Sequence, residues 1–269
     1  MARPFLKWAG GKHQLFEQLG RFVPKSFGAY YEPFVGGGAV FFALRHRPAF
    51  LSDVNEELML CYRAIRDQVD EVIRALDRHT YDRKHFYEVR DLDPEHLSIP
   101  ERVARTIFLN KTAFNGLYRV NSKGKFNVPF GRHRDPLICD RDTLRACSAA
   151  LEGVWIDSLD FTAATASAKA GDFVYFDPPY VPKSDTSYFT SYVPGGFGWD
   201  SQEKLAALFD TLTRRKVKVM LSNSDVPALR KLYAKHRIET VTATRRINSR
   251  VEARGPIDEI VVLNYQPGK

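Results

Sequence analysis

Cysteine is scarce in this sequence, and long apolar runs are missing. The 269 residues include three cysteines, Cys61, Cys139 and Cys147, whose spacing matches neither a disulfide framework nor a zinc site. No stretch approaches the ~18 consecutive apolar residues of a membrane-spanning helix. The first residues include Arg3 and Lys7 and lack the apolar core of a signal peptide. We therefore expect a cytoplasmic protein without a metal site or a membrane anchor.

Basic side chains outnumber acidic ones. Lys and Arg total 40 against 32 Asp and Glu, which gives a formal net charge of +8. The window 102–134 contains basic and aromatic residues and no Asp or Glu at all. A solvated helix face is the alternative explanation, but such a face usually carries charges of both signs. One-signed clustering among aromatic rings favours contact with nucleic acid.

Strand and helix patterns alternate at both ends of the chain. Apolar patterning predicts strands at 29–33, 49–53, 154–156, 173–176, 217–222 and 259–264. Helical spacing predicts helices at 12–22, 39–44, 56–90, 101–116, 201–215 and 226–235, and the polar stretch 117–136 predicts a hairpin or loop. We predict an α/β fold in which residues 1–55 and 154–269 form one domain, interrupted by a mostly helical insert of 56–153.

A glycine cluster follows the first predicted strand, in the segment Glu32–Gly38. Glycine lets the backbone approach a ligand closely, although an ordinary tight turn explains the cluster equally well. Asp53 ends the next predicted strand, where an acid commonly accepts hydrogen bonds from ribose hydroxyls. This order of elements favours a nucleoside cofactor. Ala39 and Val40 break the G-x-G-x-x-G spacing, which argues against NAD.

A second motif, Asp177-Pro178-Pro179-Tyr180, directly follows the apolar strand 173–176. Asp-Pro opens many ordinary turns. Here, however, the tetrad lies at the carboxyl end of a strand, where open α/β sheets bind their ligands. A rigid loop with a carboxylate, carbonyl oxygens and an aromatic ring can accept hydrogen bonds from an exocyclic amine and stack on its heterocycle.

A third motif opens the chain, where Lys7, Trp8 and Lys12 surround the pair Gly10-Gly11. Glycines and lysines ahead of a helix can bind an anion. The same residues also suit a simple capping loop, and their pattern leaves both interpretations open.

These motifs, in this order, resemble those of the Dam-type DNA adenine-N6 methyltransferases. Between them, Asn115–Arg119 and Phe126–Arg132 are similar to the target-recognition segments of that family, and the resemblance covers essentially the whole chain. It is strongest to the GATC modification methylases of type II restriction systems. The resemblance implies a Rossmann-like sheet that binds S-adenosylmethionine (SAM), an inserted target-recognition domain, and methylation of adenine N6 in double-stranded GATC.

The resemblance also implies roles for single residues. Asp177 and the backbone of Pro178 would hold the N6 amine, and Tyr180 would stack on an adenine flipped out of the duplex. The implied cofactor-binding residues are Trp8, Lys12, Glu32, Phe34, Gly36, Gly38, Asp53 and Asp177. The implied DNA-binding residues are Phe114, Asn115, Leu117, Arg119, Lys123, Pro129 and Arg132.

Within the recognition segment, Arg119 matches the arginine that recognises a guanine of GATC. Leu117 and Pro129 match residues that contribute to base discrimination, and Asn115 matches one that contacts the orphaned base. Phe114 stands where this family commonly has tyrosine; its ring can wedge into the base stack but lacks the hydroxyl. We expect a monomer whose partner is double-stranded DNA, and no stable complex with a cognate restriction endonuclease.

Three rival functions remain to be compared. N4-cytosine methyltransferases use a similar loop but usually begin it with Ser, so Asp177 argues against that reaction. An RNA methyltransferase is disfavoured by the segment from Asn115 to Arg132. A catalytically idle DNA-binding module is disfavoured by Asp177, Tyr180 and Lys12 together.

Overall fold

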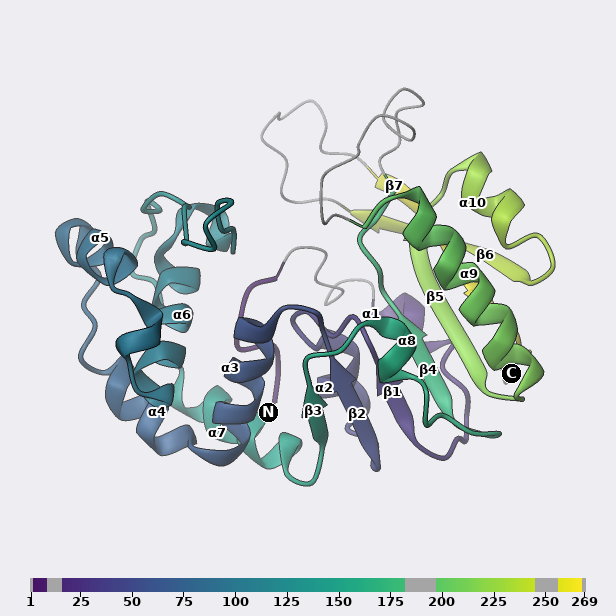
Figure 1. Ribbon diagram of the computed structural model, residues 1–269, viewed down its shortest axis with the longest axis horizontal. Helices are drawn as coiled ribbons and strands as arrows, with labels where there is room; N and C mark the ends of the chain where they lie inside the picture. The colour runs from purple at the N-terminus through teal and green to yellow at the C-terminus, as the bar shows by residue number, and fades with distance from the viewer. Residues whose placement is uncertain (1, 9–15, 182–196, 245–255, 268–269) are drawn as a thin grey trace. The chain divides into compact units, whose positions relative to one another are not determined.

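The computed structural model describes residues 2–8, 16–181, 197–244 and 256–267 (Figure 1). The chain divides into two compact units. The first contains Met1–Gly11, Val35–Arg45 and Asn55–Ser158, and the second contains Lys12–Phe34, His46–Val54 and Leu159–Lys269. The domain boundaries at 55 and 154 that we derived from the sequence stay a prediction.

Strands dominate the described part of the second unit, where they pair in the order β2-β1-β4-β5-β7-β6. Their bounds are β1 Tyr30–Glu32, β2 Ala49–Ser52, β4 Phe173–Phe176, β5 Lys218–Ser224, β6 Arg237–Thr244 and β7 Pro256–Leu263. Neighbours from β2 to β5 pair in parallel, and β7 runs antiparallel to both β5 and β6. The predicted α/β fold is confirmed.

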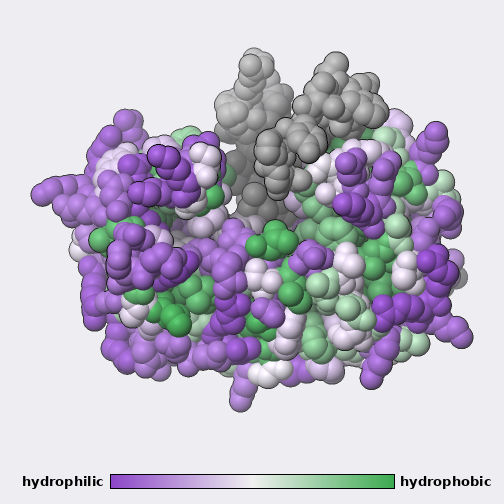
Figure 2. Space-filling model, in the orientation of Figure 1, coloured by the Kyte–Doolittle hydropathy of each residue, from purple (hydrophilic) through white to green (hydrophobic). Residues whose placement is uncertain are grey.

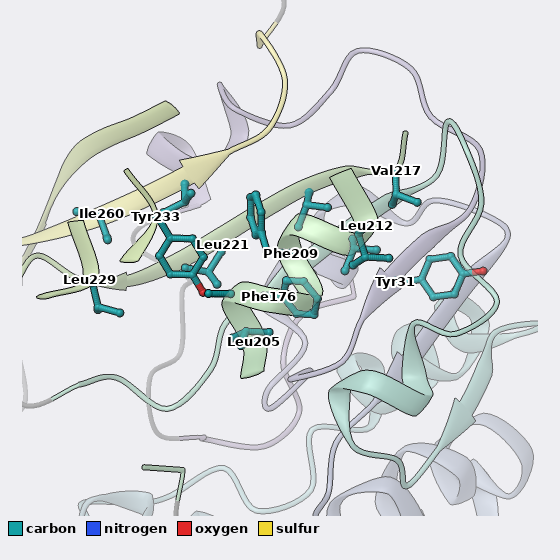
Figure 3. Close-up of a cluster of buried hydrophobic side chains, with 14 of the residues drawn as sticks. Tyr31, Phe176, Leu205, Phe209, Leu212, Val217, Leu221, Leu229, Tyr233 and Ile260 are labelled. Atoms are coloured by element: carbon teal, nitrogen blue, oxygen red, sulfur yellow. The ribbon is translucent and has the colours of Figure 1, made fainter. Parts of the chain in front are cut away.

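The core of this unit lies between the sheet and its helices (Figure 3). Helix α9, Trp199–Arg214, presents Leu205, Phe209 and Leu212 at helical spacing. These side chains cluster with apolar side chains of β4 and β5, two strands that are almost entirely buried. The other helices of the unit are α1 Phe16–Gly20, α8 Phe161–Ala164 and α10 Pro227–Leu232. Burial fixes the strands in place, because apolar area removed from water stabilises by about 25 cal/mol per Å².

Helices dominate the first unit: α2 Ala39–Leu44, α3 Glu56–Asp67, α4 Val69–Leu76, α5 Arg83–Asp91, α6 Ile99–Thr112 and α7 Arg141–Leu151. It also has the short helices η1 Pro94–His96 and η2 Phe114–Gly116, and the strand β3 Trp155–Asp157. Polar caps set several helix starts; the Asn55 side chain, for example, accepts a hydrogen bond from the backbone of Leu58. The surface over α4 and α5 is mostly hydrophilic (Figure 2). No helix in the described part of the chain is long and apolar enough to cross a membrane.

The structure corrects several predicted elements. The helical run predicted for 56–90 is three helices, because the chain leaves helical geometry at Gln68 and again before α5. Helix α7 and strand β6 were not predicted. Within the helix predicted for 12–22, residues 12–15 lie outside the described residues, and α1 spans Phe16–Gly20.

The segment predicted as a hairpin or loop forms a short antiparallel arrangement after α6. Isolated bridges join Ala113 to Phe130 and Val120 to Phe126. Phe126 and Val128 are buried while the residues between and beside them are more exposed, which is the alternation of a β-strand.

A histidine pair in the first unit predicts a pH dependence of stability. Nδ1 of His79 lies 3.0 Å from Nε2 of His85, and its ring stacks on Phe108. Burial, followed by His85, lowers the pKa of His79 from 6.5 to about 4. As the pH falls, the unfolded chain protonates this histidine at a higher pH than the folded chain does. The stability that neutral His79 contributes is therefore fully present above pH 6.5 and is lost as the pH falls toward 4.

We expect a loss of roughly 1–2 kcal/mol over that interval, discounted because His79 is only half-buried and solvent screens the effect. Urea unfolding across the interval tests this expectation. His79→Phe should keep the stacking and flatten the pH dependence, whereas His96→Gln, an exposed control, should not. If the free energy of unfolding of His79→Phe changed with pH in the same way as that of the wild type, the expected role of His79 would be wrong.

Candidate active site and DNA-contacting segment

The three carboxylates predicted for the site lie at one edge of the sheet in the second unit. Glu32 is the last residue of β1, and Asp53 and Asp177 directly follow β2 and β4. These strands are neighbours and parallel, so their carboxyl ends share an edge. Glu32 is buried, and the other two are half-buried. The structure therefore brings these three residues together.

A buried hydroxyl supports the first of these acids. Tyr30 Oη donates to Glu32 Oε2 at 2.9 Å, and both residues lie on β1. Burial, and then the charge of Glu32, raise the pKa of Tyr30 well above its ordinary value. Tyr30 therefore stays a neutral donor, which stabilises the ionised form of Glu32.

The tetrad carboxylate is also held by a hydroxyl. Ser222 Oγ, on β5, donates to Asp177 Oδ1 at 2.8 Å. The hydroxyl of Tyr175, on β4, lies 2.8 Å from the same Ser222 oxygen. Strand β5 ends in the polar run Ser222–Ser224 although it is almost entirely buried, and polar residues in a buried strand are the sequence signal that β5 contributes to the site.

Side chains of α9 and β5 fix the rest of the tetrad loop. Gln202 Nε2 donates to the Pro179 carbonyl at 3.2 Å, and Asn223 Nδ2 donates to Gln202 Oε1 at 3.1 Å. The amide of Val181 donates to Asn223 Oδ1, and the Val181 carbonyl accepts from Ser224 Oγ at 2.7 Å. The two prolines and these bonds leave the loop little conformational freedom.

The last residue of the tetrad has a partner that sequence reasoning missed. Tyr180 Oη donates to Glu259 Oε2 at 2.7 Å. Glu259 is buried in the middle of β7, directly before the apolar residues 260–263 of that strand. Burial, followed by the charges of Asp177 and Glu259, raises the pKa of Tyr180 well above its ordinary value. The ring of Tyr180 is thus anchored through a neutral hydroxyl.

An aromatic cluster surrounds Phe34, two residues beyond β1. Its ring stacks on Phe161 at 5.6 Å between centroids and makes edge contacts with Phe176 and Phe197. Phe34 itself is half-buried. The cluster offers an apolar surface beside the carboxylates of the second unit, and Phe161 and Phe197 were not predicted for the site.

The glycines of the predicted cofactor turn belong to the first unit. Gly36 and Gly38 have φ of +47° and +70°, a region that disfavours other residues. A Cβ on Gly36 would lie 3.0 Å from the Trp8 ring, and one on Gly38 would lie 2.5 Å from the Tyr62 hydroxyl. Backbone conformation and close packing both require glycine at these positions.

Trp8 contacts the glycine turn on one side and the ring of Tyr118, in the predicted recognition segment, on another. Its indole stacks on Tyr118 at 5.1 Å between centroids. Just before it, the Lys7 backbone exchanges two hydrogen bonds of 2.8 Å with the side chain of buried Asn110. Lys12 and the pair Gly10-Gly11 lie outside the described residues, so the anion-binding interpretation of this opening stays a prediction.

All residues predicted to contact DNA are exposed in the first unit: Phe114, Asn115, Leu117, Arg119, Lys123, Pro129 and Arg132. Arg119 Nε donates to Asn127 Oδ1 at 2.8 Å, which orients the guanidinium across the hairpin. At the hairpin tip, the Asn121 side chain accepts from the backbone of Lys123 and Lys125. The segment therefore presents its polar groups on an ordered backbone.

Next to this hairpin lies a pocket of about 390 Å³. It is lined by Phe114, Asn115, Phe130, Arg132 and His133. The Tyr81 hydroxyl braces the pocket wall, donating to the Gly131 carbonyl and accepting from the His133 amide. Three of the predicted DNA-binding residues thus share one concave, partly basic surface.

The acid-free basic window is less uniform than its composition indicates. Arg102 pairs with Glu57 and Glu95, and buried Arg105 donates to the carbonyls of Val89 and Arg90. Burial lowers the pKa of Lys111. Arg102 and Arg105 therefore hold α6 against neighbouring segments, and Lys111 is largely withdrawn from solvent. Within this window, the basic residues after α6 are the ones with the exposure that DNA contact requires.

Comparison with known proteins identifies the family of this site. A family model for D12 class N6 adenine-specific DNA methyltransferases matches residues 8–247. The chain is 42% identical over 271 residues to the type II methyltransferase M1.LlaDCHI of Lactococcus lactis subsp. cremoris, covering 98% of this chain and 95% of the relative.

Two further relatives match along nearly their whole length. The type II methyltransferase M.MjaIII of Methanocaldococcus jannaschii is 43% identical over 286 residues, covering 98% of this chain and 99% of the relative. The DNA adenine methylase of Escherichia coli (strain K12) is 32% identical over 270 residues, covering 99% and 96%. The resemblance found in the motifs is confirmed, and this chain belongs to the D12 class of N6 adenine-specific DNA methyltransferases.

Proposed function

We propose that this enzyme transfers the methyl group of SAM to N6 of adenine in double-stranded GATC. The observation that carries the proposal is the tetrad loop: Asp177 lies at the carboxyl edge of a parallel sheet, and its loop is hydrogen-bonded at Asp177, Pro179 and Tyr180. A rigid acceptor loop of this kind suits a reaction that depends on placing an amine.

The residues of the proposed cofactor site fit SAM chemically. A sulfonium, an ammonium and ribose hydroxyls are all complementary to carboxylates, and the second unit gathers three of these at adjacent strand ends. The proposed contacts are Trp8, Lys12, Glu32, Phe34, Gly36, Gly38, Asp53 and Asp177. When bound, SAM supplies an activated methyl group on its sulfonium. Residues 1–55 and 154–269 are proposed as the cofactor-binding domain, and 56–153 as the target-recognition domain.

The proposed chemical roles belong to three residues of the loop. Adenine must leave the duplex to be modified, and the Tyr180 ring, anchored through Glu259, would stack on the flipped base. Asp177 Oδ and the Pro178 carbonyl would accept the two hydrogens of N6, and the Pro179 carbonyl, which accepts from Gln202, would help to hold the loop. The carboxylate stabilises the positive charge that develops on the nitrogen.

Sequence recognition is assigned to the exposed segment after α6. Arg119 would donate two hydrogen bonds to a guanine, and Leu117 and Pro129 would contribute apolar contacts to neighbouring bases. Phe114 would wedge into the stack, and Asn115 would contact the orphaned base. Lys123 and Arg132 would bind phosphates. We further propose a cytoplasmic monomer that forms no stable complex with a restriction endonuclease.

Mapping the methylated bases tests the proposed specificity. Unmethylated plasmid DNA incubated with the protein and SAM should acquire N6-methyladenine at GATC sites, as located by single-molecule sequencing. Incubation without SAM is the control. Methylation at another sequence would overturn the GATC assignment, and N4-methylcytosine would overturn the proposed reaction.

Replacing Asp53 by alanine should weaken SAM binding about tenfold or more. The loss removes a charged acceptor for ribose hydroxyls, and hydrogen bonds to charged groups contribute roughly 1.5–3 kcal/mol. Isothermal titration with SAM measures the effect, while DNA affinity should stay unchanged. Asp210→Ala removes a carboxylate from α9 of the same unit and serves as the control. Unchanged SAM affinity would make Asp53 a strand-end residue without a cofactor role.

A further inference from the structure

Two buried hydroxyls form a directed chain that ends on the tetrad carboxylate. Ser222 and Tyr175 are both fully buried, on the adjacent strands β5 and β4. A serine hydroxyl carries a single hydrogen, and an ionised carboxylate can only accept. The Ser222 hydrogen is therefore committed to Asp177, and in the 2.8 Å contact between the two hydroxyls Tyr175 is the donor.

The electrostatic surroundings of Asp177 are consistent with this direction. Its charge contributes to raising the pKa of three tyrosine hydroxyls, Tyr30, Tyr175 and Tyr180. Glu32 also raises the pKa of Tyr30 and Tyr175, and Glu259 also raises the pKa of Tyr175 and Tyr180. The carboxylate thus lies among neutral hydroxyl donors and near two further acids. In such a place a donated hydrogen bond favours the ionised form and restricts rotation of the carboxylate.

We propose that Ser222, supported by Tyr175, is a positioning residue that holds the Asp177 carboxylate ready to accept the N6 amine. The inference rests on the proposed role of Asp177. Ser222 does not touch the substrate; it fixes one carboxylate oxygen so that the other faces the flipped base. Because successive hydrogen bonds polarise each other, Tyr175 strengthens the bond that Ser222 donates.

Ser222→Ala is the first test. Single-turnover methyl transfer at neutral pH should slow about tenfold, the loss expected for one hydrogen bond to a charged group. Affinities for DNA and SAM should stay within about twofold, since substrate contacts are intact. Losing a donor raises the pKa of a carboxylate, so the acid limb of the rate–pH profile should move to higher pH.

Ser224→Ala is the matched control. Ser224 lies two residues further along β5, is equally buried, and donates to the Val181 carbonyl instead of to a carboxylate. Both variants should lose similar thermal stability, but only Ser222→Ala should displace the acid limb. Ser222→Thr keeps a hydroxyl at this position. Compared with Ser222→Ala, its transfer rate and the acid limb of its rate–pH profile should lie closer to those of the wild type.

Tyr175→Phe provides a second route that leaves Ser222 in place. Alone it should move the acid limb in the same direction by a smaller amount, and in the Ser222→Ala background it should add nothing. If neither Ser222→Ala nor Tyr175→Phe moves the limb while Asp177→Asn abolishes transfer, the positioning inference is wrong. If Asp177→Asn itself transfers normally, the proposed role of Asp177 fails instead.

Discussion

Replacing Asp177 by asparagine is expected to slow methyl transfer about a hundredfold or more, with DNA binding unchanged. The amide preserves the shape of the carboxylate and still accepts from Ser222, but it lacks the charge that faces the reacting nitrogen. Removing one preorganised electrostatic partner of a transition state typically costs about 3–4 kcal/mol. Single-turnover rates on a duplex containing one GATC site measure the loss directly, and a filter-binding assay measures DNA affinity.

The same Asp-to-Asn change at another position of the second unit tests whether the effect comes from losing any carboxylate or from losing the one in the tetrad. Asp210→Asn removes a carboxylate from α9 that pairs with Lys235 and His236, away from the tetrad. It should methylate at the wild-type rate. An Asp177→Asn variant within a few-fold of wild type would show that the carboxylate is not the acceptor of the reacting amine.

Replacing Arg119 by alanine is expected to relax the preference for GATC by about ten- to a hundredfold. An arginine that donates two hydrogen bonds to guanine O6 and N7 contributes roughly 1–3 kcal/mol of discrimination. Arg119 is exposed and already oriented by Asn127, so little freedom is lost when it binds a base. Methylation rates on GATC and on each singly altered site measure the preference.

Lys123→Ala is the control for loss of a positive charge in the same hairpin. Lys123 lies at the tip, and its backbone amide donates to Asn121. Its removal should weaken binding to all sequences alike and lower the salt slope of binding by about one unit. Retention of the full GATC preference by Arg119→Ala would identify Arg119 as a phosphate contact.

The local motifs were enough to identify the family. They also predicted that the site lies at the carboxyl edge of the sheet. Each of Glu32, Asp53 and Asp177 ends or follows a strand whose apolar pattern is visible in the sequence. Parallel strands of one sheet end at one edge, so these placements follow from pattern alone. Strand β6 escaped prediction because it is an edge strand whose pairing with β7 depends on residues elsewhere in the chain.

Only the tertiary structure decided which side chains support the site and which basic residues stay exposed. Ser222 reaches Asp177, and Glu259 reaches Tyr180, from strands 45 and 79 residues away in sequence. Arg102 and Arg105 count as cations in the composition, yet they are used in pairing and in capping backbone carbonyls. A sequence motif specifies which functional groups lie close together along the chain. Burial and hydrogen-bond pairing depend instead on contacts between segments that are distant in sequence and share no local pattern.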